Sequence, residues 1–345
     1  MAPKPLPVED LDHILAHTQP LWSALENQRI FLTGGTGFFG HWLLESLLHA
    51  NRALSLNAKA TVLTRNAEAF HTKAPHIAND PAITLLEGDV KTFPYPSEHH
   101  RYVIHAATDS GGQQTQRPAY ELAESILEGT RHTLKFALET KAKRLLFTST
   151  GAVYGRNITG LTHIPEDYPG APDPLSLVSS YDEAKRMSEH LCVAYSNATP
   201  LETTIARCFA FVGPHLPLDA HFAIGNFIRD ALAGTPIHIK GDGTPLRSYL
   251  YTADLAIWLW TMLFLAPANR AYNVGSEEAH SIGALAHLTA QTLHPGLKVQ
   301  IDGTPNPSAP VPTYVPSTQR AKQELALTQH IPLEEAIRRT AAWHR

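Results

Sequence analysis

Cysteine is scarce in this sequence: there are two in 345 residues, Cys192 and Cys208, both in apolar segments and without CxxC spacing. Two such thiols do not form a disulfide framework, so we expect a cytoplasmic protein with buried, free cysteines. An excess of positive charge is also missing, since 28 Lys and Arg residues stand against 32 Asp and Glu residues. The formal net charge of −4 argues against nucleic-acid binding, and any bound phosphate must be held locally.

Long apolar runs are absent as well. The best candidate, residues 255–265, is shorter than the ~20 residues that a membrane span needs, and the N-terminus lacks the apolar core of a signal peptide. We therefore expect no membrane insertion. Although there are 20 histidines, none shows HxH or HExxH spacing, so we expect no metal site and place His99 and His100 in a polar surface turn.

Short apolar runs alternate with longer helical patterns through the first two thirds of the chain. This rhythm predicts an α/β fold, a Rossmann-like doubly wound parallel sheet with crossover helices on both faces. The runs fall at 30–32, 61–63, 83–86, 102–104, 145–147 and 204–206. The last third is interpreted as a smaller mixed α/β C-terminal lobe. Its predicted elements are helices at 224–233, 282–292 and 333–343, a strand at 237–239 and a proline-rich stretch at 305–316.

These patterns divide the chain into three parts. We expect an N-terminal extension at 1–27, a dinucleotide-binding Rossmann domain at 28–208, and a substrate-binding C-terminal lobe at 209–345 that is interleaved with the Rossmann domain. The tryptophans of the later apolar helix, Trp258 and Trp260, are expected to pack in the core. The extension is expected to hold one amphipathic helix, whose apolar face is formed by Leu11, Ile14, Leu15, Leu21 and Trp22.

A glycine-rich turn, Thr33-Gly34-Gly35-Thr36-Gly37-Phe38-Phe39-Gly40, joins the first strand to the helical pattern at 41–50. GxGxxG alone also describes an ordinary tight turn. Between a strand and a helix, however, glycines let the backbone approach a pyrophosphate, and the helix N-terminus favours the anion. We therefore expect dinucleotide binding here, although the two phenylalanine side chains are expected to pack in the core. The predicted cofactor-binding residues of the turn are Gly34, Gly37, Phe38, Phe39 and Gly40.

Two later positions bear on the choice of cofactor. Arg65 follows the second strand, where an acidic residue would accept the ribose hydroxyls of NAD. An arginine suits the 2′-phosphate of NADP, unless it stacks on the adenine or faces solvent, so NADP is favoured while NAD stays open. Gly88-Asp89-Val90 follows the third strand, and the Asp89 carboxylate there is placed either to accept the adenine amino group or to cap a helix.

Tyr181 and Lys185 lie in Ser179-Ser180-Tyr181-Asp182-Glu183-Ala184-Lys185, the opening of an amphipathic helical pattern. A spacing of four residues puts both side chains on one face of the helix. An ammonium beside a phenol, helped by the positive charge of an oxidised nicotinamide, lowers the pKa of the tyrosine toward the working pH. YxxxK alone is common on exposed helices, but after a dinucleotide-binding turn it predicts an acid/base pair.

At this point the sequence resembles the extended short-chain dehydrogenase/reductases, in particular the NAD(P)-dependent nucleotide-sugar epimerases and dehydratases. The resemblance runs from about residue 29 to the C-terminus. Beyond GGTGFFG, GDV and YDEAK, the matching motifs are HAA at 105–107, TSTGAVYG at 148–155, RCF at 207–209 with GP at 213–214, GDG at 241–243 with Arg247 and Asp254, and YNVG at 272–275. Their common order implies the family, while the function of each motif needs its own argument.

The resemblance implies a role for each catalytic residue. Tyr181 would be the acid/base on the reacting sugar hydroxyl, Lys185 would anchor the nicotinamide ribose and tune Tyr181, and Thr150 would donate a hydrogen bond to the same hydroxyl. Removal of a proton with transfer of hydride to the nicotinamide would give a keto-sugar.

The resemblance also implies binding residues. Val90, Ala106 and Ala107 would line the cofactor. Arg247 would bind the substrate diphosphate through bidentate hydrogen bonds, with a salt bridge to Asp254 or to another carboxylate as the alternative. Independently of the resemblance, residues 157–180 are long enough to form a loop over the sugar, and the acidic side chains in this segment, Glu166 and Asp167, are expected to be solvated or capping and not catalytic.

Departures from the family pattern narrow the activity. Gly151 and Ala152 stand where 4,6-dehydratases have an Asp-Glu pair, and Ala152 also replaces the glutamate of the decarboxylases. Simple redox at the sugar ring, by net epimerisation or ketone reduction, needs only the Thr-Tyr-Lys set. Since TSTGAVYG at 148–155 resembles the epimerases most, a sugar 4-epimerase with a transient 4-keto intermediate is favoured. Ala210 and Ser248 replace residues that usually bind near the diphosphate, which leaves the nucleotide and the sugar open.

Other functions stay open at this level. An NADPH-dependent keto-sugar reductase is the nearest alternative, a 4,6-dehydratase or decarboxylase fits less well, and a non-catalytic dinucleotide sensor is the alternative from another class. We expect a nucleotide-diphosphate sugar as substrate. A homodimer is expected because the helix of Tyr181 has an apolar outer face at Met187, Leu191 and Ala194.

Overall fold

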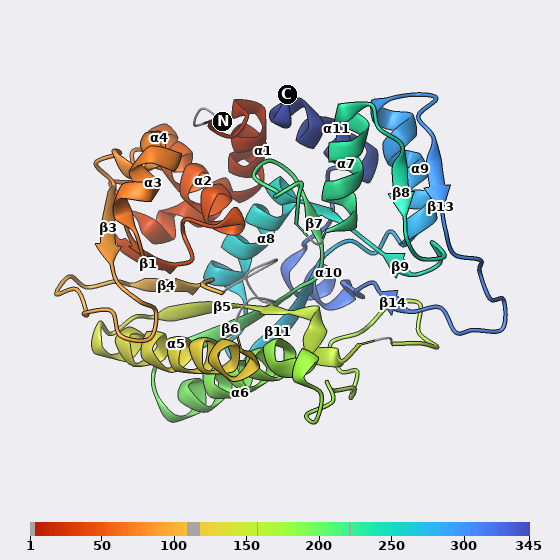
Figure 1. Cartoon of the computed structure of the whole chain (residues 1–345). Helices are drawn as coiled ribbons and strands as arrows, with labels where there is room; N and C mark the ends of the chain where they lie inside the picture. Colours follow the sequence, from red (N-terminus) through yellow and green to blue (C-terminus); the bar gives the residue numbers. More distant parts are fainter. Residues whose placement is uncertain (1–3, 109–117, 157, 221) are drawn as a thin grey trace.

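The structure is a computed structural model that describes residues 4–108, 118–156, 158–220 and 222–345 (Figure 1). The first three residues of the predicted N-terminal extension lie outside the described residues. The same holds for residue 157, the first of the predicted loop over the sugar.

Seven parallel strands form the main sheet, in the order β11-β6-β5-β4-β1-β2-β3. The chain runs outward from β1 to β3 and then returns to the other side of β1, so β1 and β4 are neighbours at the switch point where such sheets bind ligands. The predicted doubly wound α/β sheet is confirmed. Its strands are β1 (Arg29–Thr33), β2 (Lys59–Thr64), β3 (Ile83–Glu87), β4 (Tyr102–His105), β5 (Arg144–Thr150), β6 (Glu202–Cys208) and β11 (Arg270–Val274).

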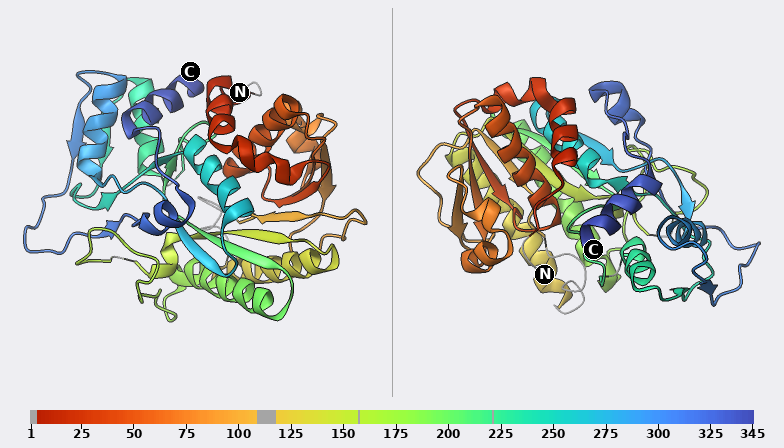
Figure 2. Two further views of the ribbon diagram at one scale, coloured as in Figure 1. Left: turned by 180° about the vertical axis from the view of Figure 1, so that it is seen from behind. Right: turned by 90° about the horizontal axis from the view of Figure 1, so that it is seen from above.

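Helices cover both faces of this sheet (Figures 1 and 2). One face carries α5 (Ala119–Glu139) and α6 (Ser180–Ala198), which pack side by side. The other carries α2 (Phe38–Leu54) and α8 (Thr252–Leu265). Trp258 and Trp260 of α8 are fully buried, as predicted. The small helices α3 (Ala67–Lys73) and α4 (Pro75–Ala78) connect β2 to β3.

The N-terminal segment packs against α2 and α8 and contains two helices instead of the single predicted one. The α-helix ends two residues before Pro20, which has no backbone N–H to continue it, and a 3-10 helix follows. Trp22 of the 3-10 helix is fully buried, and its ring centre lies 4.8 Å from that of Trp260. These helices are α1 (Val8–Thr18) and η1 (Gln19–Leu25).

The later part of the chain builds a smaller lobe of helices and short strands beside the sheet, and it also sends β11 and α8 back into the main layers (Figure 2). The helices and the strand predicted for this lobe are confirmed. Its elements are β7 (Phe211–Val212), α7 (Ala223–Ala233), β8 (Ile237–Ile239), β9 (Leu246–Arg247), β10 (Leu250–Tyr251), β12 (His280–Ser281), α9 (Ile282–Leu293), β13 (Val299–Ile301), β14 (Thr313–Tyr314), α10 (Gln319–Leu325) and α11 (Leu333–His344).

Both cysteines are buried and free, as predicted. The placement of His100 in a surface turn is wrong: its side chain is fully buried, its Nε2 lies 2.8 Å from the Thr61 hydroxyl, and its ring packs against Phe31. Among the described residues, no helix is both long and apolar enough to span a bilayer. Within the same ranges, no cluster of three or more His, Cys, Asp or Glu side chains is arranged to hold a metal ion.

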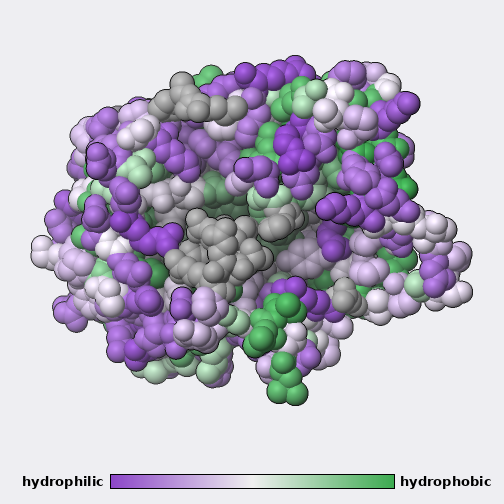
Figure 3. Space-filling view, viewed as in Figure 1, coloured by the Kyte–Doolittle hydropathy of each residue, from purple (hydrophilic) through white to green (hydrophobic). Residues whose placement is uncertain are grey.

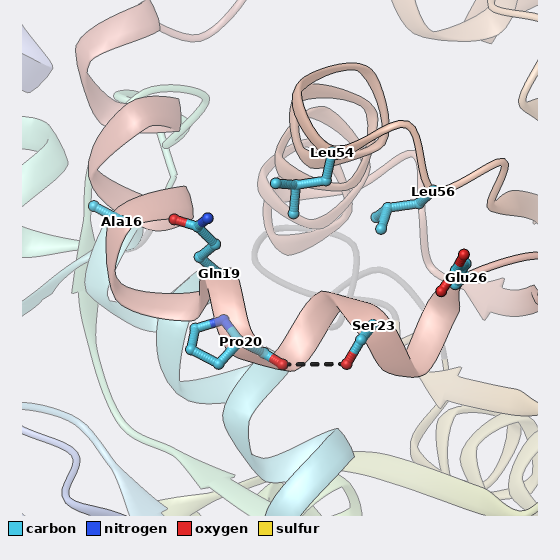
Figure 4. Close-up of a pocket in the computed structure, with 7 residues that line it drawn as sticks. All are labelled: Ala16, Gln19, Pro20, Ser23, Glu26, Leu54 and Leu56. Atoms are coloured by element: carbon cyan, nitrogen blue, oxygen red, sulfur yellow. Dashed lines mark hydrogen bonds between the residues drawn. The ribbon is translucent and has the colours of Figure 1, made fainter.

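A shallow surface depression of about 550 Å³ lies between η1 and the C-terminal end of α2 (Figure 4). It is lined by Ala16, Gln19, Pro20, Ser23, Glu26, Leu54 and Leu56. At 1.5 Å per residue, the length of α2 separates it by roughly 25 Å from the glycine turn at the other end of the helix. The depression is therefore separate from the predicted cofactor site.

Candidate active site

The glycine turn lies against the C-terminal end of β4, at the switch point of the sheet. Gly34 has φ +74°, a conformation that favours glycine, and a Cβ there would lie 2.5 Å from the backbone carbonyl of Ala106. Two hydrogen bonds join the segments, from the Ala106 N–H to the Thr33 carbonyl (3.2 Å) and from the Ala107 N–H to the Thr33 hydroxyl (3.0 Å). The predicted cofactor residues Gly34, Ala106 and Ala107 therefore meet.

The N-terminus of α2 is suited to bind a diphosphate. Gly37 is the N-cap residue, no side chain accepts the first N–H groups of the helix, and no acidic residue occupies its first turn. Gly40 packs so closely on the Gly35 backbone that a Cβ would overlap it, which brings the start of the helix tight against the strand. Free N–H groups and the positive end of a helix of 17 residues are what a pyrophosphate requires, so these residues fit a dinucleotide.

The phenylalanines of the turn contribute side chains to the core, as predicted. Both are partly buried, and the ring of Phe39 packs edge-on against Phe211 with centres 5.1 Å apart. Val90 also packs inward, and a Cβ on Gly129 of α5 would lie 2.8 Å from one of its methyl groups.

The two polar residues predicted to contact the adenosine half lie at the ends of β2 and β3. Arg65 is exposed just after β2. The carboxylate of Asp89 is exposed after β3, and its Oδ1 accepts the N–H of Lys91 at 2.9 Å. This bond closes a turn and is not the predicted helix cap, because no helix begins in the described stretch between β3 and β4.

Tyr181 and Lys185 lie one turn apart in α6, as predicted. Lys185 is 1% exposed, its Nζ donates to the Thr148 carbonyl at 2.9 Å, and it lies 4.7 Å from the centre of the Phe147 ring. Burial lowers the pKa of Lys185 to about 8 and raises the pKa of Tyr181 above its usual range. Lys185 Nζ is 6.0 Å from the centre of the Tyr181 ring. Burial, and not the ammonium, therefore dominates the ionisation of this tyrosine in the protein alone.

Thr150 ends β5 and is 8% exposed; its hydroxyl accepts the Ala152 N–H at 3.2 Å. Tyr314 of β14 lies beside it. Burial raises the pKa of Tyr314 to about 12, against the opposing effect of the Thr150 hydroxyl. Tyr314 is also close enough to Tyr181 to raise the pKa of Tyr181. The three hydroxyl groups thus converge on one place.

The lobe brings Arg247 to the same place. Its guanidinium lies 5.8 Å from the centre of the Tyr314 ring, and one of its nitrogens donates to the Leu246 carbonyl. The alternative salt bridge to Asp254 is not formed, because Asp254 Oδ2 accepts the N–H groups of His330 and Ile331. Arg247 therefore lies near the predicted catalytic residues with its charge available to a ligand.

Sequence reasoning missed Tyr314, because β14 lies within the proline-rich stretch at 305–316 and carries no motif. It also misjudged Glu166, whose side chain is 4% exposed and not solvated: Oε1 accepts the Asn273 N–H at 3.0 Å. Burial raises the pKa of Glu166. Glu166 thereby ties the loop before α6 to β11.

A buried ion pair fixes α6 against the sheet. Arg207 of β6 binds the Glu189 carboxylate with two nitrogens, at 3.1 and 2.7 Å, and donates to the Tyr154 hydroxyl at 2.8 Å. Tyr154 in turn donates to Asn273 Oδ1 at 2.7 Å. Arg207 of the RCF motif thus holds α6 through Glu189, and Asn273 of the YNVG motif is joined to Arg207 through Tyr154. Removal of either partner of the ion pair would leave an unpaired charge in the interior, which is strongly destabilising.

A family model described as "NAD dependent epimerase/dehydratase family" matches residues 30–275, which span the glycine turn and the Thr-Tyr-Lys set. This chain belongs to that family. The predicted family resemblance is therefore confirmed, and the chain is a NAD-dependent epimerase/dehydratase family enzyme.

Curated relatives in the family share about a quarter of their residues with this chain. UDP-N-acetyl-alpha-D-glucosaminuronate decarboxylase of Bacillus cytotoxicus is 27% identical over 324 residues, covering 92% of this chain and 98% of the relative. UDP-glucuronic acid decarboxylase 3 of Arabidopsis thaliana is 28% identical over 312 residues, covering 90% and 87%.

Solved structures share the fold. UDP-glucose 4-epimerase of Thermotoga maritima, solved with UDP-glucose, has a TM-score of 0.74 at 20% identity and covers 92% of this chain and 98% of its own. dTDP-glucose 4,6-dehydratase of Streptomyces venezuelae, solved with NAD bound, has a TM-score of 0.76 at 22% identity and covers 92% and 97%. Solved enzymes with two different reactions, a 4-epimerase and a 4,6-dehydratase, thus share this fold.

Proposed function

We propose that this enzyme is a nucleotide-sugar 4-epimerase that acts through a transient 4-keto intermediate. The observation that carries the proposal is the convergence of Thr150, Tyr181 and Tyr314 around one site, with Lys185 behind it and the uncapped N-terminus of α2 beside it. Hydroxyl groups of this kind suit proton exchange with a sugar hydroxyl.

The side chains divide the work. Tyr181 removes the proton of the sugar hydroxyl and later returns it, and Thr150 orients the same hydroxyl. Lys185, held by Thr148, provides the nearby positive charge that makes a tyrosinate accessible. The nicotinamide of a dinucleotide held at the N-terminus of α2 would supply the acceptor and donor of the hydride and a further positive charge. Since burial, and then the neighbouring Tyr314, raise the pKa of Tyr181 in the protein alone, proton transfer is expected only in the loaded enzyme.

Ala152 argues against elimination or decarboxylation, although the curated relatives named above are decarboxylases. Its methyl group has no ionisable proton, and its N–H is already bound to the Thr150 hydroxyl. Gly151 and Ala152, the two residues that follow Thr150, therefore supply no acid to assist the loss of water or of CO2. The keto-sugar returns to an alcohol by reversal of the two transfers, which is epimerisation when the sugar turns over in between.

Binding assignments follow from the same geometry. Arg247 binds the substrate diphosphate, and the end of β2 binds the adenosine ribose. Arg65 at that end favours NADP, whereas the family description and the NAD-containing dehydratase favour NAD. Calorimetric titration with NAD+ and NADP+, on the wild type and on Arg65→Ala, decides between them: an NADP preference must disappear in the variant.

The activity is tested with a panel of UDP-, dTDP-, GDP- and CDP-sugars, including UDP-glucuronate. An epimerase equilibrates two sugars without net use of cofactor, a reductase consumes NADPH stoichiometrically, and a decarboxylase releases CO2. Tyr181→Phe is expected to lower turnover by about 10²–10⁴-fold. Tyr195→Phe, the same change about four turns further along α6, serves as control and is expected to leave turnover unchanged. If Tyr181→Phe alters no reaction, the chain is a dinucleotide sensor and not an enzyme.

We also propose a homodimer. Figure 3 shows apolar side chains projecting at the lower centre of this face, where the segment leading into α6 lies in Figure 1. Exposed apolar residues of this segment and of α6 are Leu175, Leu177, Val178 and Met187. Sedimentation of the wild type and of Leu177→Asp tests this: the proposal requires a dimer that the aspartate weakens, and a wild-type monomer at micromolar concentration contradicts it.

A further inference from the structure

A buried chain of hydrogen bonds runs from the cofactor turn to α6. His105, the last residue of β4, is 3% exposed. Its Nδ1 lies 2.7 Å from the Thr33 hydroxyl, and its Nε2 lies 3.1 Å from the Thr130 hydroxyl of α5. The Thr130 hydroxyl lies 3.0 Å from the Ser188 hydroxyl of α6. The imidazole thus connects β1, α5 and α6.

The direction of each bond can be assigned, because a hydroxyl carries one hydrogen. The Thr130 hydroxyl donates its hydrogen to the carbonyl of Ile126 at 2.8 Å, because a carbonyl can only accept. In the other two bonds the Thr130 oxygen is therefore the acceptor, from the Ser188 hydroxyl and from His105 Nε2–H. At the other end the Thr33 oxygen receives the Ala107 N–H and donates its own hydrogen to His105 Nδ1. A neutral imidazole protonated on Nε2 satisfies every member.

We propose that His105 is a positioning residue that holds α6, with Tyr181 and Lys185, at a fixed place relative to the cofactor turn. The inference rests on the proposed function, because it assigns His105 to the same reaction. The backbone strengthens the link, since the Thr148 hydroxyl donates to the His105 carbonyl at 3.3 Å and the Thr148 carbonyl accepts Lys185 Nζ.

The neutral state of His105 is also supported by its surroundings. The charged group that acts on it is Lys185, and its ring stacks on Phe147 with centres 5.5 Å apart. Burial first, and then the ammonium, lower the pKa of His105 to about 3. The imidazole of His105 therefore stays neutral at every pH at which the enzyme would work, so its hydrogen bonds to Thr33 and Thr130 do not change with pH.

Helix α5 offers a matched pair of variants. Thr130 and Thr133 are both fully buried and both donate to the carbonyl four residues earlier. Among the contacts described, only Thr130 also meets His105 and Ser188. Valine has the shape of threonine without the hydroxyl, so Thr130→Val cuts the chain and Thr133→Val removes a local bond alone.

Thr130→Val is expected to weaken NAD+ binding by about 3- to 10-fold, the value of one lost hydrogen bond, and to lower kcat with little change in KM for the sugar. Thr133→Val is expected to change both quantities less than twofold while losing similar thermal stability. Equal effects of the two variants on NAD+ affinity and on kcat would overturn the inference.

Nitrogen NMR provides a readout without substrate. The His105 signals are identified by their loss in His105→Gln. They are expected to show the Nε2–H tautomer with no titration between pH 5 and 8, and Thr130→Val is expected to lose this tautomer preference. An Nδ1–H form, or an ordinary titration near pH 6.5, refutes the inference. If the wild type binds NAD+ but converts no sugar nucleotide, the proposed function fails. The NAD+ affinities of the two threonine variants and the NMR signals of His105 still decide the role of His105 in that case.

Discussion

Gly34→Ala is expected to lower the free energy of unfolding for two reasons, which comparison with a second glycine separates. The first is backbone strain, because φ is +74° and a side chain in the left-handed region costs about 1–2 kcal/mol. The second is overlap, since the added Cβ would lie 2.5 Å from the Ala106 carbonyl group and 2.7 Å from the Ala107 nitrogen. Backbone atoms yield poorly, so we expect a further ~1–3 kcal/mol, as for other overpacked sites.

Gly160 is the matched control. It has φ +77°, but nothing lies within 4 Å of its added Cβ. Urea unfolding of Gly160→Ala should therefore show the strain alone, about 1–2 kcal/mol less the ~0.4–1 kcal/mol gained by restricting the unfolded chain. Gly34→Ala should lose ~1–3 kcal/mol more, with an unchanged slope against urea. Equal losses for the two variants would refute the close contact between the glycine turn and the end of β4.

Further changes test the site and the core. Lys185→Met should lower turnover by at least ~10²-fold, whereas Arg186→Met, on the exposed face of the same helix, should leave it unchanged; comparable kcat values contradict the role of Lys185. Trp22→Ala should lower the free energy of unfolding in urea by ~3–5 kcal/mol. Val8→Ala, at a side chain that is 61% exposed, should lower it by less than ~0.5 kcal/mol. A similarly small loss for Trp22→Ala would mean that the N-terminal helices are not part of the core. Burial lowers the pKa of His100 from 6.5 to about 4, so the unfolded chain binds its proton first and stability falls as the pH drops from 6.5 to 4. His100→Gln should remove up to ~3 kcal/mol of that fall, and identical pH profiles of unfolding disprove the neutral, buried state.

Local sequence was enough for the parts of the site that one turn or one helix builds. The glycine spacing predicts the turn between β1 and α2 because the backbone requirements lie within eight consecutive residues. The four-residue spacing of Tyr181 and Lys185 predicts their common face for the same reason. Strand and helix order in the sheet likewise follow from runs of apolar residues.

Contacts between distant segments could not be predicted this way. Tyr314 reaches Thr150 only because β14 pairs with β9 and so lies over the end of β5. The burial of His100 depends on its contact with Thr61 and Phe31, and the burial of Glu166 on a backbone N–H of β11. In each case a polar residue type suggests exposure, whereas a partner far along the chain makes burial possible.

The placement of β11 has a consequence for synthesis on the ribosome. Strand β6 is complete at Cys208, but the strand that covers its edge ends at Val274, and α8 is made just before it. While the intervening residues are being translated, the nascent sheet has an unpaired edge and an uncovered apolar face, the features that promote aggregation of incomplete chains. Chains stalled between these two points should therefore depend on chaperones far more than chains released after Val274.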